Sequence, residues 1–281
     1  MEEYTQLSNG VEIPKLGFGV FQITDYDECK QAVLDALSNG IRLIDTAEAY
    51  FNEKAVGDAI KESKIPREEI FITTKIWITD YGYENTKKAF KESCEKLGTD
   101  YIDLYLIHQN IGDVYGTWRA MEELYEEDKI KAIGISNFTK ARLYDFCVHN
   151  KIKPMVLQIE VNPFYQQDDI VDYCKDMDIQ VEAWSPLAEG RNNIFQNPVL
   201  TEIGDKYNKS VAQVIIRWLI QRDIIVFPKS VHPERIKENA DVFDFELSDE
   251  DMKKIATLDT GVGSVDLDSY DFIKMINSYT D

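Results

Sequence analysis

The chain has 281 residues, of which 44% are hydrophobic, and its formal net charge is −20 at pH 7. This length suits either one barrel or two small domains, and the composition is typical of a soluble globular protein. The strong negative charge disfavours nucleic acid and anionic membrane surfaces as partners of the whole molecule.

No apolar stretch reaches the roughly 18 residues that a membrane span requires. The N-terminal residues lack a basic region followed by an apolar run, so no signal peptide is expected and a cytoplasmic location is predicted. The four cysteines, Cys29, Cys94, Cys147 and Cys174, form no C-x-x-C pair, and each falls in a predicted helix. Neither a disulfide framework nor a metal site is expected, which fits a reducing compartment.

The first element predicted along the chain is a β-hairpin at residues 7–13. Asn9-Gly10 is a signal for a tight turn between two short strands. We expect this hairpin to cover the bottom of the fold that follows.

Eight apolar, β-prone runs come next. Near-continuous apolar runs are typical of strands that are buried on both faces. The runs are Gly17–Phe21, Arg42–Thr46, Phe71–Ile76, Tyr101–His108, Lys131–Ser136, Val156–Val161, Gln180–Ser185 and Ile224–Pro228.

Helical patterns lie between these runs. Residues 83–97 place Phe90, Cys94 and Leu97 on one face at spacings of three and four, and residues 211–222 do the same with Val214 and Trp218. Alternating strands and helices predict a parallel sheet with right-handed crossovers. Eight such units close a (β/α)8 TIM barrel more naturally than an open sheet, with chemistry at the C-terminal ends of its strands.

Two segments are longer than simple connections, namely residues 189–208 and the polar, loop-like tail at residues 261–281. Long loops in compact domains are often functional, so both are candidate loops on the active-site face. No Pro- or Ser-rich linker divides the chain, and residues 1–281 are therefore expected to form one domain.

Ionisable residues interrupt the apolar runs where three successive strands end. Asp45 ends the second run, Lys75 the third and His108 the fourth, while Tyr50 follows Asp45 by five residues. A free tyrosine is a poor acid at neutral pH, but a nearby ammonium such as that of Lys75 favours its phenolate. Asp45 would keep Lys75 charged, and His108 would orient a substrate oxygen or relay a proton. Together these groups could polarise and protonate a carbonyl.

These residues also carry a family resemblance. Six segments, in family order and covering roughly residues 5–260, resemble the aldo-keto reductase family: Gly40–Glu53, Leu97–His108, Lys131–Phe138, Gln158–Pro163, Ala183–Leu187 and Pro228–Asn239. The resemblance implies a catalytic tetrad of Asp45, Tyr50, Lys75 and His108. It also implies reduction of aldehydes, ketones or α-dicarbonyls by direct hydride transfer from NADPH, without a metal, by a monomer.

The cofactor site must differ from a Rossmann fold, because Gly17-Phe-Gly19 lacks the third glycine of that fingerprint. A basic cluster after the eighth run suits phosphate, since it lies beside a predicted helix N-terminus. The resemblance implies that Lys229, Ser230 and Arg235 bind the 2′-phosphate of NADPH, and that Glu238 and Asn239 address the adenine.

Further cofactor residues follow from the resemblance alone. Ser136, Asn137 and Gln158 should hold the nicotinamide carboxamide, and Trp184 should stack on its ring. Ser185, Leu187 and Glu189 should line the pyrophosphate. Gly19, Val20 and Val231 complete the expected cofactor set.

The substrate pocket is expected to contain His108, Phe21, Trp77 and Gln109. Trp118 is either another apolar wall or a core residue on an amphipathic stripe with Met121. Many family members have Trp-Pro after the catalytic histidine, whereas this chain has Gln109-Asn110. The sequence leaves two other functions open: a non-catalytic NADP-sensing subunit on the same fold, and a Schiff-base aldolase that uses Lys75.

Overall fold

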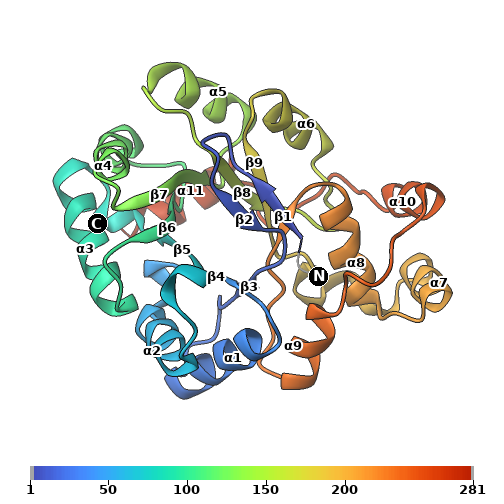
Figure 1. The fold of residues 1–281 in the computed structure, drawn as a ribbon. Coiled ribbons are helices and arrows are strands. Elements are labelled where there is room, and N and C mark those ends of the chain that lie inside the picture. Colours follow the sequence, from blue (N-terminus) through green and yellow to red (C-terminus); the bar gives the residue numbers. More distant parts are fainter. Residues whose placement is uncertain (1–2, 280–281) are drawn as a thin grey trace.

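A computed structural model of the chain describes residues 3–279 and forms a (β/α)8 barrel (Figure 1). The eight parallel strands are neighbours in chain order, and a parallel bridge between Leu16 and Val226 joins the last strand to the first. The strands are β3 (Phe18–Gly19), β4 (Leu43–Asp45), β5 (Phe71–Ile76), β6 (Ile102–Ile107), β7 (Ile130–Ser136), β8 (Val156–Glu160), β9 (Gln180–Trp184) and β10 (Ile225–Val226).

The helices surround this barrel. They are α1 (Tyr26–Ser38), α2 (Glu53–Ser63), α3 (Tyr83–Leu97), α4 (Val114–Glu126), α5 (Lys140–His149), α6 (Asp168–Asp176), α7 (Pro198–Tyr207), α8 (Val211–Gln221), α9 (Pro233–Ala240), α10 (Asp249–Ala256) and α11 (Tyr270–Asn277). Four 3-10 segments join them: η1 (Glu48–Tyr50), η2 (Arg67–Glu69), η3 (Ile78–Asp80) and η4 (Ala188–Gln196).

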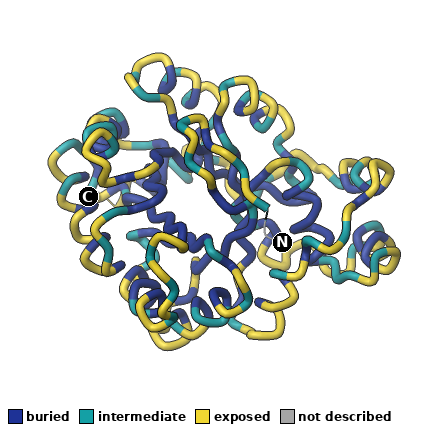
Figure 2. The backbone as a smooth tube through the Cα atoms, in the orientation of Figure 1, coloured by how far each residue is buried: buried dark blue, intermediate teal, exposed yellow. Residues whose placement is uncertain are grey.

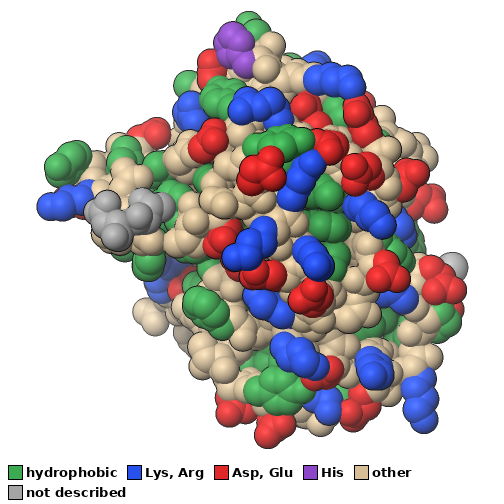
Figure 3. All heavy atoms as spheres, turned by 90° about the vertical axis from the view of Figure 1, so that its left-hand side faces the viewer, with side chains coloured by type: hydrophobic (Ala, Val, Ile, Leu, Met, Phe, Trp, Pro, Cys, Tyr) green, Lys and Arg blue, Asp and Glu red, His purple; other side chains and the backbone are tan. Residues whose placement is uncertain are grey.

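The core lies between the strands and the inner faces of the helices, as Figure 2 shows. Each predicted apolar run overlaps one observed strand, and every residue of β5 and β6 is buried. The four cysteines are buried free thiols. Each lies in a helix, namely α1, α3, α5 or α6, as the sequence predicts. On the face that carries α3 and α4, basic and acidic side chains alternate (Figure 3). Ion pairs such as Lys87 with Glu123 account for part of that pattern.

The predicted hairpin consists of β1 (Tyr4–Gln6) and β2 (Glu12–Pro14), and it crosses the front of the barrel in Figure 1. Gly10 takes a φ of +88°, which glycine adopts without a steric penalty. Asn9 donates a hydrogen bond of 2.9 Å to the Lys131 carbonyl at the start of β7. The hairpin therefore covers the N-terminal ends of the strands, as predicted.

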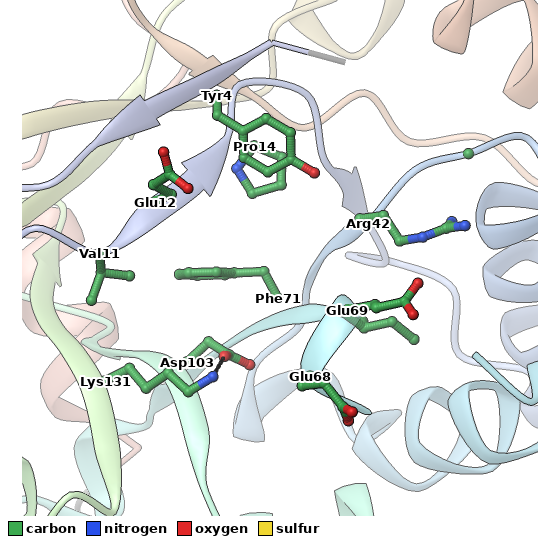
Figure 4. A pocket seen from close by; sticks show the side chains of 12 residues that line it. Tyr4, Val11, Glu12, Pro14, Arg42, Glu68, Glu69, Phe71, Asp103 and Lys131 are labelled. Atoms are coloured by element: carbon green, nitrogen blue, oxygen red, sulfur yellow. Dashed lines mark ion pairs between the residues drawn. The ribbon is translucent and has the colours of Figure 1, made fainter. Parts of the chain in front are cut away.

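A hollow of about 450 Å³ lies between the hairpin and the barrel floor (Figure 4). Tyr4 and Pro14 line it from the hairpin, and Phe71 and Lys131 line it from the starts of β5 and β7. Because it lies at the N-terminal ends of the strands, this hollow is at the opposite end of the barrel from the predicted chemistry.

Two sequence predictions about long segments need correction. Residues 261–281 are not a pure loop, because α11 forms there: Ser269 caps it by accepting a hydrogen bond from Phe272 N–H, and Ile276 is buried. Residues 189–208 are also largely ordered, since η4 and α7 occupy most of them. Both segments contain a short amphipathic helix whose few apolar residues stand among polar neighbours, so the sequence did not predict either helix. Figure 1 shows α11 behind the barrel, at the end opposite to the hairpin.

Of the two alternatives for Trp118, the pocket wall is wrong and the core residue is confirmed. Its side chain is fully buried in α4, packs edge-on against Phe146 at 5.0 Å, and donates its indole N–H to the Ile152 carbonyl. Trp118 therefore belongs to the helix layer outside the barrel and forms no wall of a substrate pocket.

Candidate active site

The centre of the site is a buried ion pair between neighbouring strands. Lys75 on β5 is fully buried, and its Nζ lies 2.8 and 2.7 Å from the two carboxylate oxygens of Asp45 at the end of β4. The same ammonium donates to the Thr46 carbonyl at 2.9 Å. Burial lowers the pKa of Lys75, but its acidic neighbours, with Asp45 first among them, together more than offset this, so the pKa is raised and the ammonium stays charged.

Tyr50 is brought to this ion pair by the short turn η1. Its hydroxyl lies 3.5 Å from Lys75 Nζ, and Phe51 ends the turn at a left-handed φ of +57°. Burial raises the pKa of Tyr50 above its ordinary value, and the ammonium of Lys75 opposes that rise. The effect of Lys75 thus has the expected direction, but burial is the larger effect and keeps the phenol protonated.

His108 follows β6 and faces Tyr50, with ring centroids 5.6 Å apart and the rings nearly perpendicular. Burial, assisted by the positive charge of Lys75, holds the pKa of His108 well below its ordinary value. The imidazole is therefore neutral at pH 7 and can donate one ring N–H to an oxygen. Its Nδ1 has no hydrogen-bond partner within the described part of the chain.

Aromatic side chains surround Tyr50 and His108. Phe21 packs on Tyr50 with a centroid separation of 5.0 Å, and Trp77 packs edge-on against His108 at 5.0 Å. Tyr279 packs against the far side of this wall, 5.6 Å from Trp77. Tyr279 was not predicted from the sequence, because nothing in the tail's composition indicated that it returns to the barrel.

The two amides that replace Trp-Pro are buried directly after His108. The Tyr81 hydroxyl holds Gln109 by donating to its carbonyl and accepting from its N–H, both at 2.8 Å. The side-chain oxygens of Gln109 and Asn110 have no hydrogen-bond partner among residues 3–279. Gln109 therefore has its backbone fixed by a tyrosine that the sequence analysis did not single out.

The residues expected around a carboxamide lie together at the ends of β7, β8 and β9. Ser136 Oγ donates to the Gln158 carbonyl at 3.0 Å. The Asn137 side chain donates to the His108 carbonyl and accepts the indole N–H of Trp184, each at 3.0 Å. These bonds leave Asn137 one amide hydrogen to offer a ligand.

Gln158 also uses part of its hydrogen-bonding capacity within the protein. Its Nε2 lies 2.9 Å from Asp45 Oδ1 and 2.9 Å from Glu182 Oε2, and its side chain is almost fully buried. Both amide hydrogens therefore point to carboxyl oxygens of the protein, which leaves only the amide oxygen to accept a bond from a ligand.

Two further groups of predicted residues lie at the outer rim. Ser185 takes a left-handed φ of +52°, and its buried hydroxyl has no partner in the described chain. Leu187 is half-buried just before η4, and Glu189 begins a run of left-handed residues inside that segment. Gly19 and Val20 hydrogen-bond through their N–H groups to Pro228 and Asp45, so they lie beside the end of β10.

The basic cluster lies where α9 begins. Lys229 and Arg235 are exposed and form no ion pair with any residue between 3 and 279, while Ser230 is buried. Pro233 occupies the first turn of the helix, whose free N–H groups attract anions. The half-buried Val231, the exposed Glu238 and the buried Asn239 flank the cluster. Two unpaired cations in so acidic a chain fit a phosphate ligand.

Two carboxyl groups near the tetrad were not singled out from the sequence. Glu48 in η1 accepts the Trp77 backbone N–H at 2.8 Å, and burial raises its pKa to about 7. Glu182 in β9 is fully buried, and burial raises its pKa to about 8. For Glu182, the signal available in the sequence was an acidic residue between two apolar ones, in Val181-Glu182-Ala183.

Residues 3–279 contain no group of three or more histidine, cysteine or acidic side chains that could hold a metal ion. Within the same residues, no helix is long and apolar enough to cross a membrane.

Comparison with known proteins agrees with this arrangement. The glyoxal reductase of Bacillus subtilis (strain 168) is 51% identical over 92% of this chain and 93% of its own length. The methylglyoxal reductase of Escherichia coli (strain K12) is 41% identical over 91% and 93%. A silkworm (Bombyx mori) aldo-keto reductase in complex with NADP superposes with a TM-score of 0.90 at 35% identity, covering 95% of each chain. Residues 15–260 match the aldo/keto reductase family as a whole. The chain belongs to the aldo/keto reductase family.

Proposed function

We propose that this protein is an NADPH-dependent carbonyl reductase in which Tyr50 donates a proton to the substrate oxygen. The observation that carries the proposal is the contact between Lys75 Nζ and the Tyr50 hydroxyl, 3.5 Å apart, with Asp45 behind the ammonium. A phenol beside a fixed ammonium can release its proton as negative charge develops on a nearby oxygen.

The roles of the four residues follow from their charges. His108, kept neutral by burial, would donate a ring N–H to the carbonyl oxygen and orient it toward Tyr50. Tyr50 would give up its proton to that oxygen, and Lys75 would stabilise the phenolate that remains. Asp45 would keep Lys75 charged and in position. The cofactor, when bound, supplies the hydride for the carbonyl carbon.

The residues expected to hold NADPH fit such a ligand. The Gln158 amide oxygen and the remaining amide hydrogen of Asn137 offer one acceptor and one donor to a carboxamide. The unpartnered hydroxyl of Ser185 would bond to a phosphate oxygen, and Lys229 and Arg235 would pair with the 2′-phosphate. Trp184 would stack on the nicotinamide ring.

The substrate class that we propose is small aldehydes and ketones, with α-dicarbonyls first among them. Relatives at 51% and 41% identity are named as reductases of glyoxal and methylglyoxal. Phe21 and Trp77 bring apolar surface to the reacting centre from two sides. The rim therefore suits a compact, uncharged carbonyl compound.

The test is the replacement of Tyr50 by Phe, which removes the proton donor and keeps the ring. Turnover of methylglyoxal should fall at least ~10²-fold, a typical general-acid contribution, while NADPH binding measured by fluorescence stays unchanged. Tyr270→Phe is the matched control, because Tyr270 is 77% exposed and lies far along the tail. Near-normal turnover in Tyr50→Phe would rule out the role of Tyr50. NADPH binding without turnover by the unmodified protein would instead favour a cofactor-sensing subunit.

A further inference from the structure

One buried acid beneath the tetrad has no part in the mechanism above. Glu182 is fully buried in β9, and its Oε2 lies 2.9 Å from Gln158 Nε2. The same Nε2 lies 2.9 Å from Asp45 Oδ1. A continuous chain of contacts therefore runs from Glu182 through Gln158 to Asp45 and on to Lys75.

The two carboxyl contacts fix which way the Gln158 amide faces. An ionised Asp45 can only accept hydrogen bonds, so the amide nitrogen must face it. Glu182 takes the second hydrogen of that nitrogen, and the amide oxygen is thereby turned away from both acids. Without Glu182, only one of the two contacts would resist rotation of the amide.

We propose that Glu182 is a positioning residue that locks the Gln158 amide, so that its nitrogen holds Asp45 and its oxygen faces the nicotinamide carboxamide. This inference rests on the proposed NADPH binding at Gln158. Through Gln158, Glu182 couples the cofactor site to the Asp45–Lys75 ion pair.

The geometry also indicates the protonation state in which Glu182 acts. Its Oε1 has no hydrogen-bond partner among residues 3–279, and a buried carboxylate oxygen without a donor is costly. Asp45 on β4 adds repulsion, whereas Lys75 on β5 and Gln158 on β8 act in the opposite direction. The β10 residue in register with Glu182 is the apolar Ile225. Glu182 is thus a neutral acid at neutral pH, in keeping with a pKa raised to about 8.

Ionisation of Glu182 has a direct consequence for the reaction. The new negative charge would sit one residue from Asp45 in the contact chain and would raise the pKa of Tyr50. A weaker acid transfers its proton less readily, so carbonyl reduction should slow as the pH rises through about 8.

Two substitutions separate the two parts of the proposal. Glu182→Gln keeps an oxygen that can accept from Gln158 but cannot ionise, and Glu182→Leu removes the acceptor. NADPH should bind Glu182→Gln within about 2-fold of the unmodified protein and Glu182→Leu roughly 3- to 10-fold more weakly, the effect of one hydrogen bond. The decline of kcat/KM above pH 8 should move to higher pH in Glu182→Gln.

Thr73→Val is the matched control. Thr73 lies two residues before Lys75 on the same face of β5, is fully buried, and also has an unpartnered oxygen among the described residues. This change, which nearly keeps the side-chain volume, should alter neither NADPH affinity nor the pH profile, because the Thr73 hydroxyl forms no hydrogen bond with any residue among 3–279. A similar loss in Thr73→Val would show that any polar deletion in the barrel weakens binding, and would overturn the proposal.

Several results would overturn the inference. One is that Glu182→Leu binds NADPH as tightly as the unmodified protein does. Another is that kcat/KM of Glu182→Gln declines at the same alkaline pH as kcat/KM of the unmodified protein. If Glu182→Leu does not fold, infrared spectroscopy decides: the unmodified protein at pH 6 should show a protonated-carboxyl band that Glu182→Gln lacks. Absence of that difference contradicts the neutral acid. The comparison of NADPH affinities needs no turnover, so it tests the role of Glu182 even if the proposed reductase activity is not found. A protein that binds no NADPH would refute both the proposed function and the role of Glu182.

Discussion

The Glu48 carboxylate accepts the Trp77 backbone N–H at 2.8 Å and so ties two parts of the candidate active site together. Glu48 belongs to η1, the turn that carries Tyr50, and Trp77 precedes η3 and packs against His108. This one hydrogen bond joins the turn of the proposed acid to the aromatic wall of the pocket. A change in the charge of Glu48 should therefore affect both the turn η1 and Trp77.

The charge of Glu48 should make protein stability depend on pH. Burial, together with the neighbouring acids Asp80 and Glu53, raises its pKa from 4.5 to about 7, although the Trp77 N–H acts in the opposite direction. A raised carboxyl pKa means that the folded state favours the neutral acid. The contribution of Glu48 to stability is thus complete below pH 4.5 and is lost as the pH rises through about 7.

Glu48→Gln removes this titration and keeps an oxygen for Trp77 N–H. The melting temperature of the unmodified protein should fall relative to that of Glu48→Gln between pH 5 and pH 8, as followed by circular dichroism. Glu234→Gln, an exposed acid in α9, serves as the control and should show no such difference. Parallel melting curves for Glu48→Gln and the unmodified protein would contradict the assignment.

Tyr81 should be important for the position of His108. Its hydroxyl makes both 2.8 Å bonds to the Gln109 backbone, directly after His108. Tyr81→Phe leaves a buried N–H and a buried carbonyl without that partner, which should destabilise the protein by about 1–3 kcal/mol in urea unfolding. Methylglyoxal turnover should fall as well, because Gln109, which directly follows His108, loses the two hydrogen bonds that fix its backbone. Tyr83→Phe, which removes a hydroxyl bonded to Glu123 near the surface, should have a much smaller effect.

The Asp45–Lys75 pair should behave as a buried ion pair. Lys75→Met leaves the Asp45 carboxylate buried and uncompensated, and should destabilise the protein by about 3–5 kcal/mol. The double variant Asp45→Asn/Lys75→Met removes both charges and should recover part of that loss, although it stays inactive. Equal unfolding free energies for the single and double variants would mean that the two charges do not interact. Urea denaturation followed by circular dichroism measures both.

The barrel itself was predictable from the sequence because its strands are buried on both faces. The run Phe71–Ile76 became β5 residue for residue, since every position of that strand is buried. The same property hid Glu182. In a strand that is buried on both faces, the two-residue alternation is lost, so the sequence could not show that this acid points inward toward Gln158.

The tail illustrates a different reason for failure. Within α11 only Ile276 is fully buried, so its apolar pattern is too sparse to stand out from a polar segment. The contact between Tyr279 and Trp77 joins residues far apart in the chain. No local pattern encodes such a contact. By contrast, the sequence predicted that Asp45, Lys75 and His108 lie close together, because residues at the ends of neighbouring parallel strands meet at one rim.

The cluster at the start of α9 should determine the choice between NADPH and NADH. Lys229 and Arg235 form no ion pair within the described residues, so both charges are available to a 2′-phosphate. Replacing either by Ala should weaken NADPH binding roughly 10- to 100-fold, the effect of one charge-assisted hydrogen bond, and leave NADH binding unchanged. Fluorescence titration with both nucleotides measures the ratio. Lys237→Ala is the control, since Lys237 is exposed on the same helix two residues beyond Arg235, and it should leave the ratio intact. Equal weakening for NADPH and NADH would show that the cluster acts only through the general electrostatic field and does not contact the phosphate.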